Sequence, residues 1–343
     1  MRSSTFTRRR TVTALGLAGV LATGSAIVVA INGSDSSQAA TQTAQTAQTG
    51  QAAQAVTAAR AISCSTATGG KPFYDGPSAS KVYDARFSNS AAVPYLGTHT
   101  PQGAGTWWNW DGKKDLILVT AYRKGANSLI IGIDPATNKA VGAVAIAPTH
   151  VGGITTSNGW AFVQGGTNTI RKYKLSTLRT AMKAPKTPKI NPVGPDRKVY
   201  GASFLTSYGG YLWSGKFNEN GRDKMYQYKI NSNGSLTTIN KAWEVPTKTQ
   251  GLMVTGSHFV FSTSYDRDKR SNLYVVRRGQ PDLDKATLRC FRAPSMSEGI
   301  TEYGGRAYLL YESGSHLYRG DSRTLNVITR LHKATVSSLT NLA

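Results

Sequence analysis

Acidic residues are scarce in this sequence, which has 18 Asp and Glu against 41 Lys and Arg over 343 residues. The signatures of common metal and catalytic sites are missing too. There is no His-Glu-x-x-His, EF-hand loop, Cys-x-x-Cys or Gly-x-Ser-x-Gly. These absences exclude the usual zinc protease, calcium-loop and nucleophile-elbow classes, and we expect neither a metal nor a cofactor.

Cysteine is nearly absent, since Cys64 and Cys290 are the only two. Two cysteines so far apart do not form a zinc or redox motif. In an exported protein they would form a disulfide, because oxidising compartments favour this bond. We therefore predict a Cys64–Cys290 disulfide that closes a very long loop.

An export leader is predicted over residues 1–30. "MRSSTFTRRR" is basic, and "TVTALGLAGVLATGSAIVVA" is a long uncharged apolar run. Arg9 and Arg10 resemble a twin-arginine element. Cleavage near Ala30 or Ala39 would release a secreted protein, free or associated with the cell wall. An uncleaved leader would instead anchor it in the membrane.

Residues 31–60 form a low-complexity Ala/Thr/Gln linker, which cannot bury a core and is predicted to be disordered. Glutamines recur every third residue, at Gln42, Gln45, Gln48, Gln51 and Gln54. The linker is either a solvated spacer or an acyl-donor tail for an extracellular transglutaminase.

The excess of basic residues predicts adhesion to polyanions, since the formal net charge is +23. The densest cluster is the segment 171–198, in which Asp196 is the only acid. Its candidate polyanion patch is Arg171, Lys172, Lys174, Arg179, Lys183, Lys186 and Lys189. Tyr173 is the only aromatic residue in this segment, so specific recognition of nucleic acid by base stacking is not expected.

A repeat runs through the rest of the chain. "APTHVGG", "VPTKTQG" and "APSMSEG" each place a Pro five residues before a Gly. With two looser copies, the repeated glycines are Gly105, Gly153, Gly201, Gly251 and Gly299, spaced by 48, 48, 50 and 48 residues. Four strand-like segments per unit at this period predict a β-propeller.

We therefore predict an all-β fold in which residues 61–343 form a single five-bladed β-propeller domain. Each repeated glycine would mark a close backbone approach at the start of an innermost strand. "KVYDARF" (81–87) is a candidate extra strand, and "HLYRGD" (316–321) a candidate third strand of the last unit. If 61–104 formed most of another blade, there would be six.

The segment "SLIIGIDPATNKAVGAVAIA" (128–147) resembles the repeats of YVTN-type and quinoprotein-like propellers, which carry a similar "IDPATNK" hairpin. The other units match this family by pattern alone. The chain also resembles a group of secreted actinobacterial propeller proteins whose role is unclear. The resemblance implies a secreted propeller and transfers no catalytic residue.

Candidate ligand-binding residues follow from the repeat, because propeller ligands meet the face where innermost strands begin. Just before the glycines lie Ala104, Gly152, Tyr200, Gln250 and Glu298, and three residues earlier lie Gln102, His150, Lys198, Lys248 and Met296. Glu298 and His150 would be the catalytic residues of an enzyme. By this reasoning Glu312 lies a full strand away from Glu298. If Glu298 is not catalytic, it would pair with Lys248 or cap a buried network.

The last candidate is "TWWNW" (106–110), which suits either core packing or a sugar-binding platform. Strand alternation would place Trp108 and Trp110 on one face and Trp107 on the other. Taken together, the sequence favours a non-catalytic propeller that binds an anionic envelope polymer or a protein partner. The alternative is a glycan hydrolase or lyase with Glu298 at the channel mouth.

Overall fold

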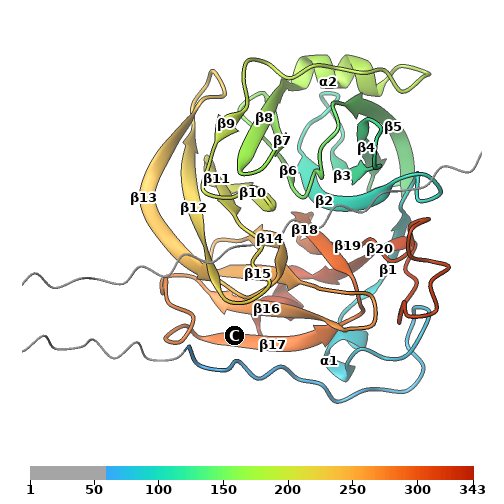
Figure 1. Ribbon diagram of the computed structural model, residues 1–343, viewed down its shortest axis with the longest axis vertical. Coiled ribbons are helices and arrows are strands. Elements are labelled where there is room, and N and C mark those ends of the chain that lie inside the picture. Colours follow the sequence, from blue (N-terminus) through green and yellow to red (C-terminus); the bar gives the residue numbers. More distant parts are fainter. Residues whose placement is uncertain (1–58) are drawn as a thin grey trace, which may run out of the picture. The chain divides into compact units, whose positions relative to one another are not determined.

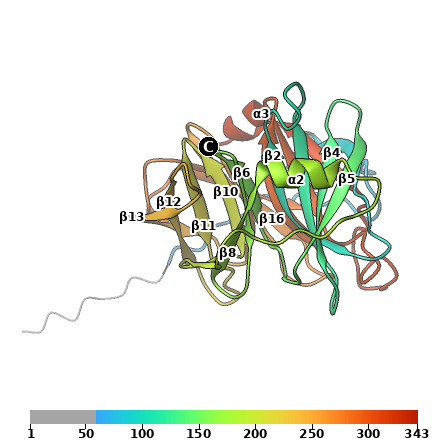
Figure 2. The ribbon, with the colours of Figure 1, turned by 90° about the horizontal axis from the view of Figure 1, so that it is seen from above.

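The computed structural model describes residues 59–343, which form an all-β ring of five four-stranded antiparallel sheets. Figure 1 shows the sheets arranged as blades around a common centre, and Figure 2 shows the same ring from the side. The predicted five-bladed propeller is confirmed. The export leader and nearly all of the linker, including the repeated glutamines, lie outside the described residues.

The first four blades follow the chain, and each uses four consecutive strands from the axis outward. Blade 1 contains β2 (Thr100–Trp107), β3 (Leu116–Tyr122), β4 (Ser128–Asp134) and β5 (Lys139–Ile146). Blade 2 contains β6 (Ile154–Ser157), β7 (Trp160–Gln164), β8 (Thr169–Lys174) and β9 (Arg197–Lys198). Blade 3 contains β10 (Phe204–Tyr208), β11 (Tyr211–Gly215), β12 (Asp223–Ile230) and β13 (Leu236–Val245). Blade 4 contains β14 (Thr249–Val254), β15 (His258–Thr263), β16 (Ser271–Arg277) and β17 (Leu288–Ala293).

Blade 5 closes the ring by combining the two ends of the domain. It contains β18 (Ser297–Tyr303), β19 (Arg306–Tyr311), β20 (Arg330–Thr335) and, as its outer strand, β1 (Ser88–Ala92). Ser88 pairs with Lys333 in the antiparallel β1–β20 ladder. This pairing covers the edge of β20 that would otherwise stay open.

The structure corrects three details of the sequence-based prediction. "KVYDARF" is not a strand, because Ser80 Oγ accepts a hydrogen bond from Tyr83 N and caps the short helix α1 (Lys81–Asp84). "HLYRGD" lies in a loop, and the third strand of blade 5 is β20. There is no sixth blade, because residues 61–104 supply one strand to blade 5 and most of the first strand of blade 1.

The repeated glycines lie where neighbouring inner strands approach most closely. A Cβ at Gly299 would overlap the backbone of Gly103 and Ala104 in blade 1, and one at Gly251 would overlap the backbone of Glu298 in blade 5. Any side chain would push these strands apart. The predicted role of the glycines is therefore confirmed at these positions, and their regular spacing follows from the geometry of the ring.

Apolar clusters fill the gaps between blades. The second strands β3, β7, β11, β15 and β19 are almost fully buried, since each packs against a neighbouring sheet on both faces. One cluster, for example, joins Phe204 and Trp213 of blade 3 to Leu252 and Phe259 of blade 4. Each blade thus depends on its neighbours for burial of its sheet, as in other repeat folds.

Two features tie the periphery to the ring. Cys64 and Cys290 form the predicted disulfide, and Ser65 N donates to Cys290 O at 2.8 Å, so this segment lies along the outer edge of blade 4. Helix α2 (Leu175–Met182) covers the outside of blades 1 and 2, and helix α3 (Val336–Thr340) follows β20 (Figures 1 and 2). No helix within residues 59–343 is long and apolar enough to cross a membrane.

Candidate functional site

A pocket of about 410 Å³ opens at the end of the ring where the inner strands begin. We call it the axial pocket. Its polar walls include Gln102, His150, Gln164, Gln250, Glu298 and Glu312, and its aromatic walls include Tyr122, Phe217, Tyr265 and Tyr318. All five blades contribute to this lining, so the pocket exists only in the closed ring.

Glu298 and Glu312 lie in the same pocket because they come from one hairpin. Strand β18 begins beside the end of β19, and Ser297 is paired with Tyr311. Glu298 follows Ser297 in β18, and Glu312 follows Tyr311 directly after the end of β19. The sequence-based view that Glu312 lies a strand away from Glu298 is therefore wrong, since an antiparallel hairpin returns the chain to the end from which it started.

The two carboxylates have different surroundings. Glu298 is 1% exposed, and its Oε1 has no hydrogen-bond partner among the described residues. Burial, reinforced by the negative charge of Glu312, raises the pKa of Glu298 well above its usual range. Glu312 is partly buried and accepts a hydrogen bond from Gln102 Nε2 at 2.7 Å. Burial raises its pKa to about 7, while the hydrogen bond and Arg267 act in the opposite direction.

Of the residues predicted for the channel mouth, the structure brings Gln102, His150, Gln250, Met296 and Glu298 together in the axial pocket. His150 lies at the exposed rim, with its ring centroid 4.7 Å from that of Tyr122.

The remaining ring candidates are placed elsewhere. Lys248 does not pair with Glu298, because its Nζ lies 4.5 Å from the ring centroid of Tyr265. Lys198 belongs to the outermost strand of blade 2. Tyr200 donates a hydrogen bond to Asp223 at 2.6 Å and is absent from the pocket lining. The repeat is looser at Gly201, and this explains why the offsets fail for Lys198 and Tyr200.

Sequence reasoning missed the other half of the lining. Tyr122, Gln164, Phe217, Tyr265 and Glu312 all stand at or just after the end of a second strand. These positions are equivalent in the repeat. In each blade the end of the second strand lies beside the start of the first. Including the ends of the second strands in the repeat analysis would have identified these residues.

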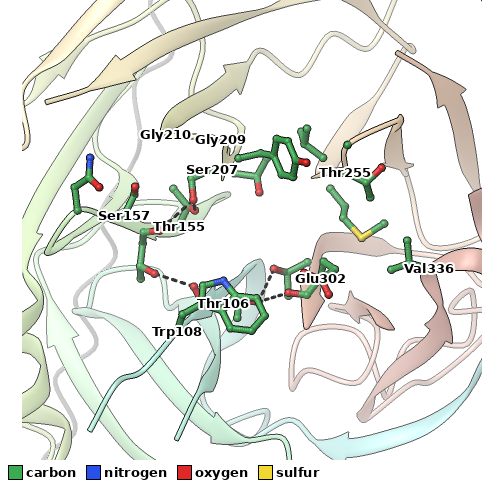
Figure 3. Close-up of a pocket in the computed structure, with 18 of the residues that line it drawn as sticks. Thr106, Trp108, Thr155, Ser157, Ser207, Gly209, Gly210, Thr255, Glu302 and Val336 are labelled. Atoms are coloured by element: carbon green, nitrogen blue, oxygen red, sulfur yellow. Dashed lines mark hydrogen bonds between the residues drawn. The ribbon is translucent and has the colours of Figure 1, made fainter. Parts of the chain in front are cut away.

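A second opening lies at the opposite end of the inner strands, where a hollow of about 650 Å³ is rich in hydroxyl groups. Figure 3 shows Thr106, Thr155 and Ser207 around it, each from a different blade. The hydroxyls mostly satisfy one another across blades. Thr106 bonds to Thr301 at 3.0 Å, and Thr155 bonds to Ser207 at 2.7 Å. These hydrogen bonds join blade 1 to blade 5 and blade 2 to blade 3, which is a sufficient role for these side chains.

The tryptophans of "TWWNW" divide between the core and this second opening. Trp107 and Trp110 are buried with ring centroids 6.0 Å apart, whereas Trp108 is 51% exposed and lines the hollow (Figure 3). The alternation predicted for these residues is wrong. The chain leaves the strand after Trp107 and turns at Asn109, which has a φ of 55°, so Trp110 returns to the core.

Part of the predicted polyanion patch stabilises the fold. Arg171 pairs with Asp196 at 3.1 Å, Lys172 lies 4.6 Å from the ring centroid of Trp160, and Arg179 donates to the backbone oxygen of Trp110. The exposed remainder, which we call the lysine arch, is Lys174, Lys183, Lys186 and Lys189. No acidic side chain within residues 59–343 forms an ion pair with an arch lysine.

The segment that carries the arch is held firmly against blade 1. Ile190 N donates to Ala145 O at 3.0 Å, and Ala145 N donates to Pro188 O at 2.8 Å. Leu178 and Met182 of α2 are buried in the core between blades 1 and 2. The exposed lysines therefore stand on a structured support.

The donor set gives little support to a metal centre. Across residues 59–343, no three His, Cys, Asp or Glu side chains are grouped so as to hold a metal ion. The axial pocket offers a carboxylate pair, neutral amides and aromatic rings, which suit hydrogen bonding, proton transfer and recognition of a cation.

No protein-family model matches the chain, and no curated protein matches its sequence. Among solved structures, the chain is similar to the glutaminyl cyclase of Myxococcus xanthus, with 10% identity and a TM-score of 0.45 over 73% of this chain and 95% of that one. It is also similar to a chain of a nidogen/laminin complex, with 12% identity and a TM-score of 0.35 over 62% and 72%. A third similarity is to the Pan2 WD40 domain of Neurospora crassa, with 10% identity and a TM-score of 0.32 over 68% and 63%. At these levels the similarities concern the propeller fold alone.

Proposed function

We propose that this protein is an exported propeller that binds an anionic polymer of the cell envelope through the lysine arch. The observation that carries the proposal is the arch itself: four exposed lysines, without acidic partners within residues 59–343, on a structured support. Such a surface attracts phosphate or uronate polymers over a range set by the ionic strength.

Export is part of this proposal. The basic, apolar N-terminal segment supports it, and so does the disulfide, because such bonds persist in oxidising compartments. The hairpin "IDPATNK" supports a relation to secreted propellers of the YVTN type. A polymer of the envelope would meet the protein in that compartment.

The test is retention of the protein on purified wall teichoic acid at increasing salt. Replacing all four arch lysines by Gln should weaken retention and flatten its salt dependence, because fewer counterions are released on binding. The matched control replaces Lys81, Lys224, Lys229 and Lys241, four other exposed lysines, and removes the same charge. Equal weakening in both variants, or retention that ignores salt, would contradict a site at the arch.

The proximity of Glu298 and Glu312 supports a second candidate, a glycan hydrolase or lyase. Glycosidases use a pair of carboxyl groups about 5 to 10 Å apart, one of them with a raised pKa. Screening the protein and its Glu298→Gln variant on a panel of glycans tests this candidate. Turnover that disappears in the variant would support it, and an inactive wild-type protein would count against it.

A further inference from the structure

Glu298 is a buried carboxylate that the protein leaves without a counter-charge. Among residues 59–343, its Oε1 has no hydrogen-bond partner, and no lysine, arginine or histidine forms an ion pair with it. Burying a charge in this way is costly unless a proton or a bound cation compensates it. The orphaned oxygen belongs to a residue that lines the axial pocket.

The surrounding charges do not supply that compensation. Arg267 is the nearby cation, but it pairs with Asp321 and stacks 5.0 Å from the ring centroid of Tyr318. The ammonium of Lys248 lies over Tyr265. The pocket lining itself contains three carboxylates, Glu298, Glu312 and Asp266, and no lysine or arginine. An otherwise basic protein thus has an acidic pocket on its axis.

The other walls specify what kind of cation fits. Tyr122 and Phe217 present aromatic surface, which attracts organic ammonium groups, and the side-chain oxygen of Gln250 is a hydrogen-bond acceptor. A volume of about 410 Å³ suits a small molecule. No three His, Cys, Asp or Glu side chains in residues 59–343 are grouped so as to hold a metal ion, which favours an organic cation as the ligand.

From this geometry we propose that the axial pocket binds a small primary amine in its ammonium form, with Glu298 and Glu312 as the counter-charges. The ammonium would take the place of the proton that the carboxylate pair otherwise holds. This site is independent of the lysine arch, since it lies on the axis and has the opposite charge.

Isothermal titration calorimetry of the full-length protein with n-butylamine tests the proposal. 1-Butanol serves as the uncharged analogue and calcium chloride as the metal probe. We expect saturable binding of n-butylamine and no binding of 1-butanol. In Glu298→Gln, affinity should fall at least about tenfold, because the counter-charge is lost. The matched control is Glu302→Gln, which removes a carboxylate from the same strand at the opposite opening.

A second measurement uses the wild-type protein alone, so the proposal stays testable if the variant does not fold. Titration in two buffers of different ionisation enthalpy should reveal release of a proton when the amine binds near neutral pH. Equal binding of 1-butanol, stronger binding of calcium, full affinity in Glu298→Gln, or no binding of the amine would each overturn the proposal. Retention on teichoic acid should stay unchanged in Glu298→Gln, which separates this site from the arch.

Discussion

Gln102 of blade 1 donates a hydrogen bond from Nε2 to Oε2 of Glu312 in blade 5 at 2.7 Å. The bond crosses from the first blade to the last, so the acidic pocket is completed only when the ring closes. Closure in turn depends on β1, the outer strand that residues 88–92 add to blade 5. Loosening of this blade would therefore disturb the charge state of the pocket.

Removing that donor should make Glu312 harder to ionise. In Gln102→Leu the carboxylate loses a hydrogen bond that favours its charged form, so the pKa of Glu312 should rise above about 7. NMR titration of ¹³C-labelled glutamate carboxyls measures this shift. Gln227→Leu on blade 3 is the control, and an unchanged Glu312 titration in Gln102→Leu would refute the assigned role.

Glu298 should make stability depend on pH. A carboxyl whose pKa is raised on folding binds its proton more tightly in the native state, so stability is lost as the pH rises above 4.5, the ordinary pKa of this carboxyl. Glu298→Gln removes the decrease in stability that ionisation of the Glu298 carboxyl causes at high pH. Urea unfolding should find the variant more stable than wild type at about pH 8.5, with the difference shrinking at about pH 5. A variant that is less stable at the higher pH would contradict the burial of an uncompensated charge.

His332 should act in the opposite direction. It is buried, with Nδ1 bonded to Tyr83 Oη at 2.7 Å, and burial lowers its pKa to about 3. Stability is then complete above about pH 6.5 and is lost as the pH falls towards 3, because the unfolded chain takes up the proton first. His332→Gln should lose less stability than wild type between pH 7 and 4. The control is the same substitution at the exposed His316.

The disulfide should stabilise the folded chain strongly, because it joins residues 226 positions apart. The entropic model assigns about 5 kcal/mol to a loop of this length. Thermal melts should place the Cys64→Ser/Cys290→Ser variant well below oxidised wild type, whereas the two proteins should agree under reducing conditions. Were the difference to persist after reduction, the serines rather than the lost bond would be responsible.

The repeated glycines should tolerate no side chain. Gly299→Ala would drive a Cβ into the backbone of blade 1 and is expected to cost at least about 1 to 3 kcal/mol. Gly221→Ala is the matched control, because a Cβ there meets nothing within 4 Å. Chemical denaturation of both variants measures the contrast, and a Gly299→Ala protein as stable as the control would mean that the blades pack less closely than described.

The repeat by itself determined the architecture. Because each blade must bury its sheet against its neighbours, the same glycine, turn and apolar strand recur near every 48 residues, and this period is readable without coordinates. The disulfide was also predictable, since the chain has two cysteines. These features are local or periodic, and for that reason sequence alone could reveal them.

Ring closure and the pocket were decided only by the tertiary structure. Residues 88–92 complete the last blade through a pairing with residues some 240 positions away, and no local propensity signals that partner. Glu298 and Glu312 meet because a hairpin folds back on itself, and Gln102 joins them because the first blade closes on the last. Lys198 and Tyr200 share the repeat position of such residues but lie outside the pocket, since a small shift in a looser blade changes where a side chain is placed. Contacts between distant segments depend on the closed ring, and only the folded chain establishes them.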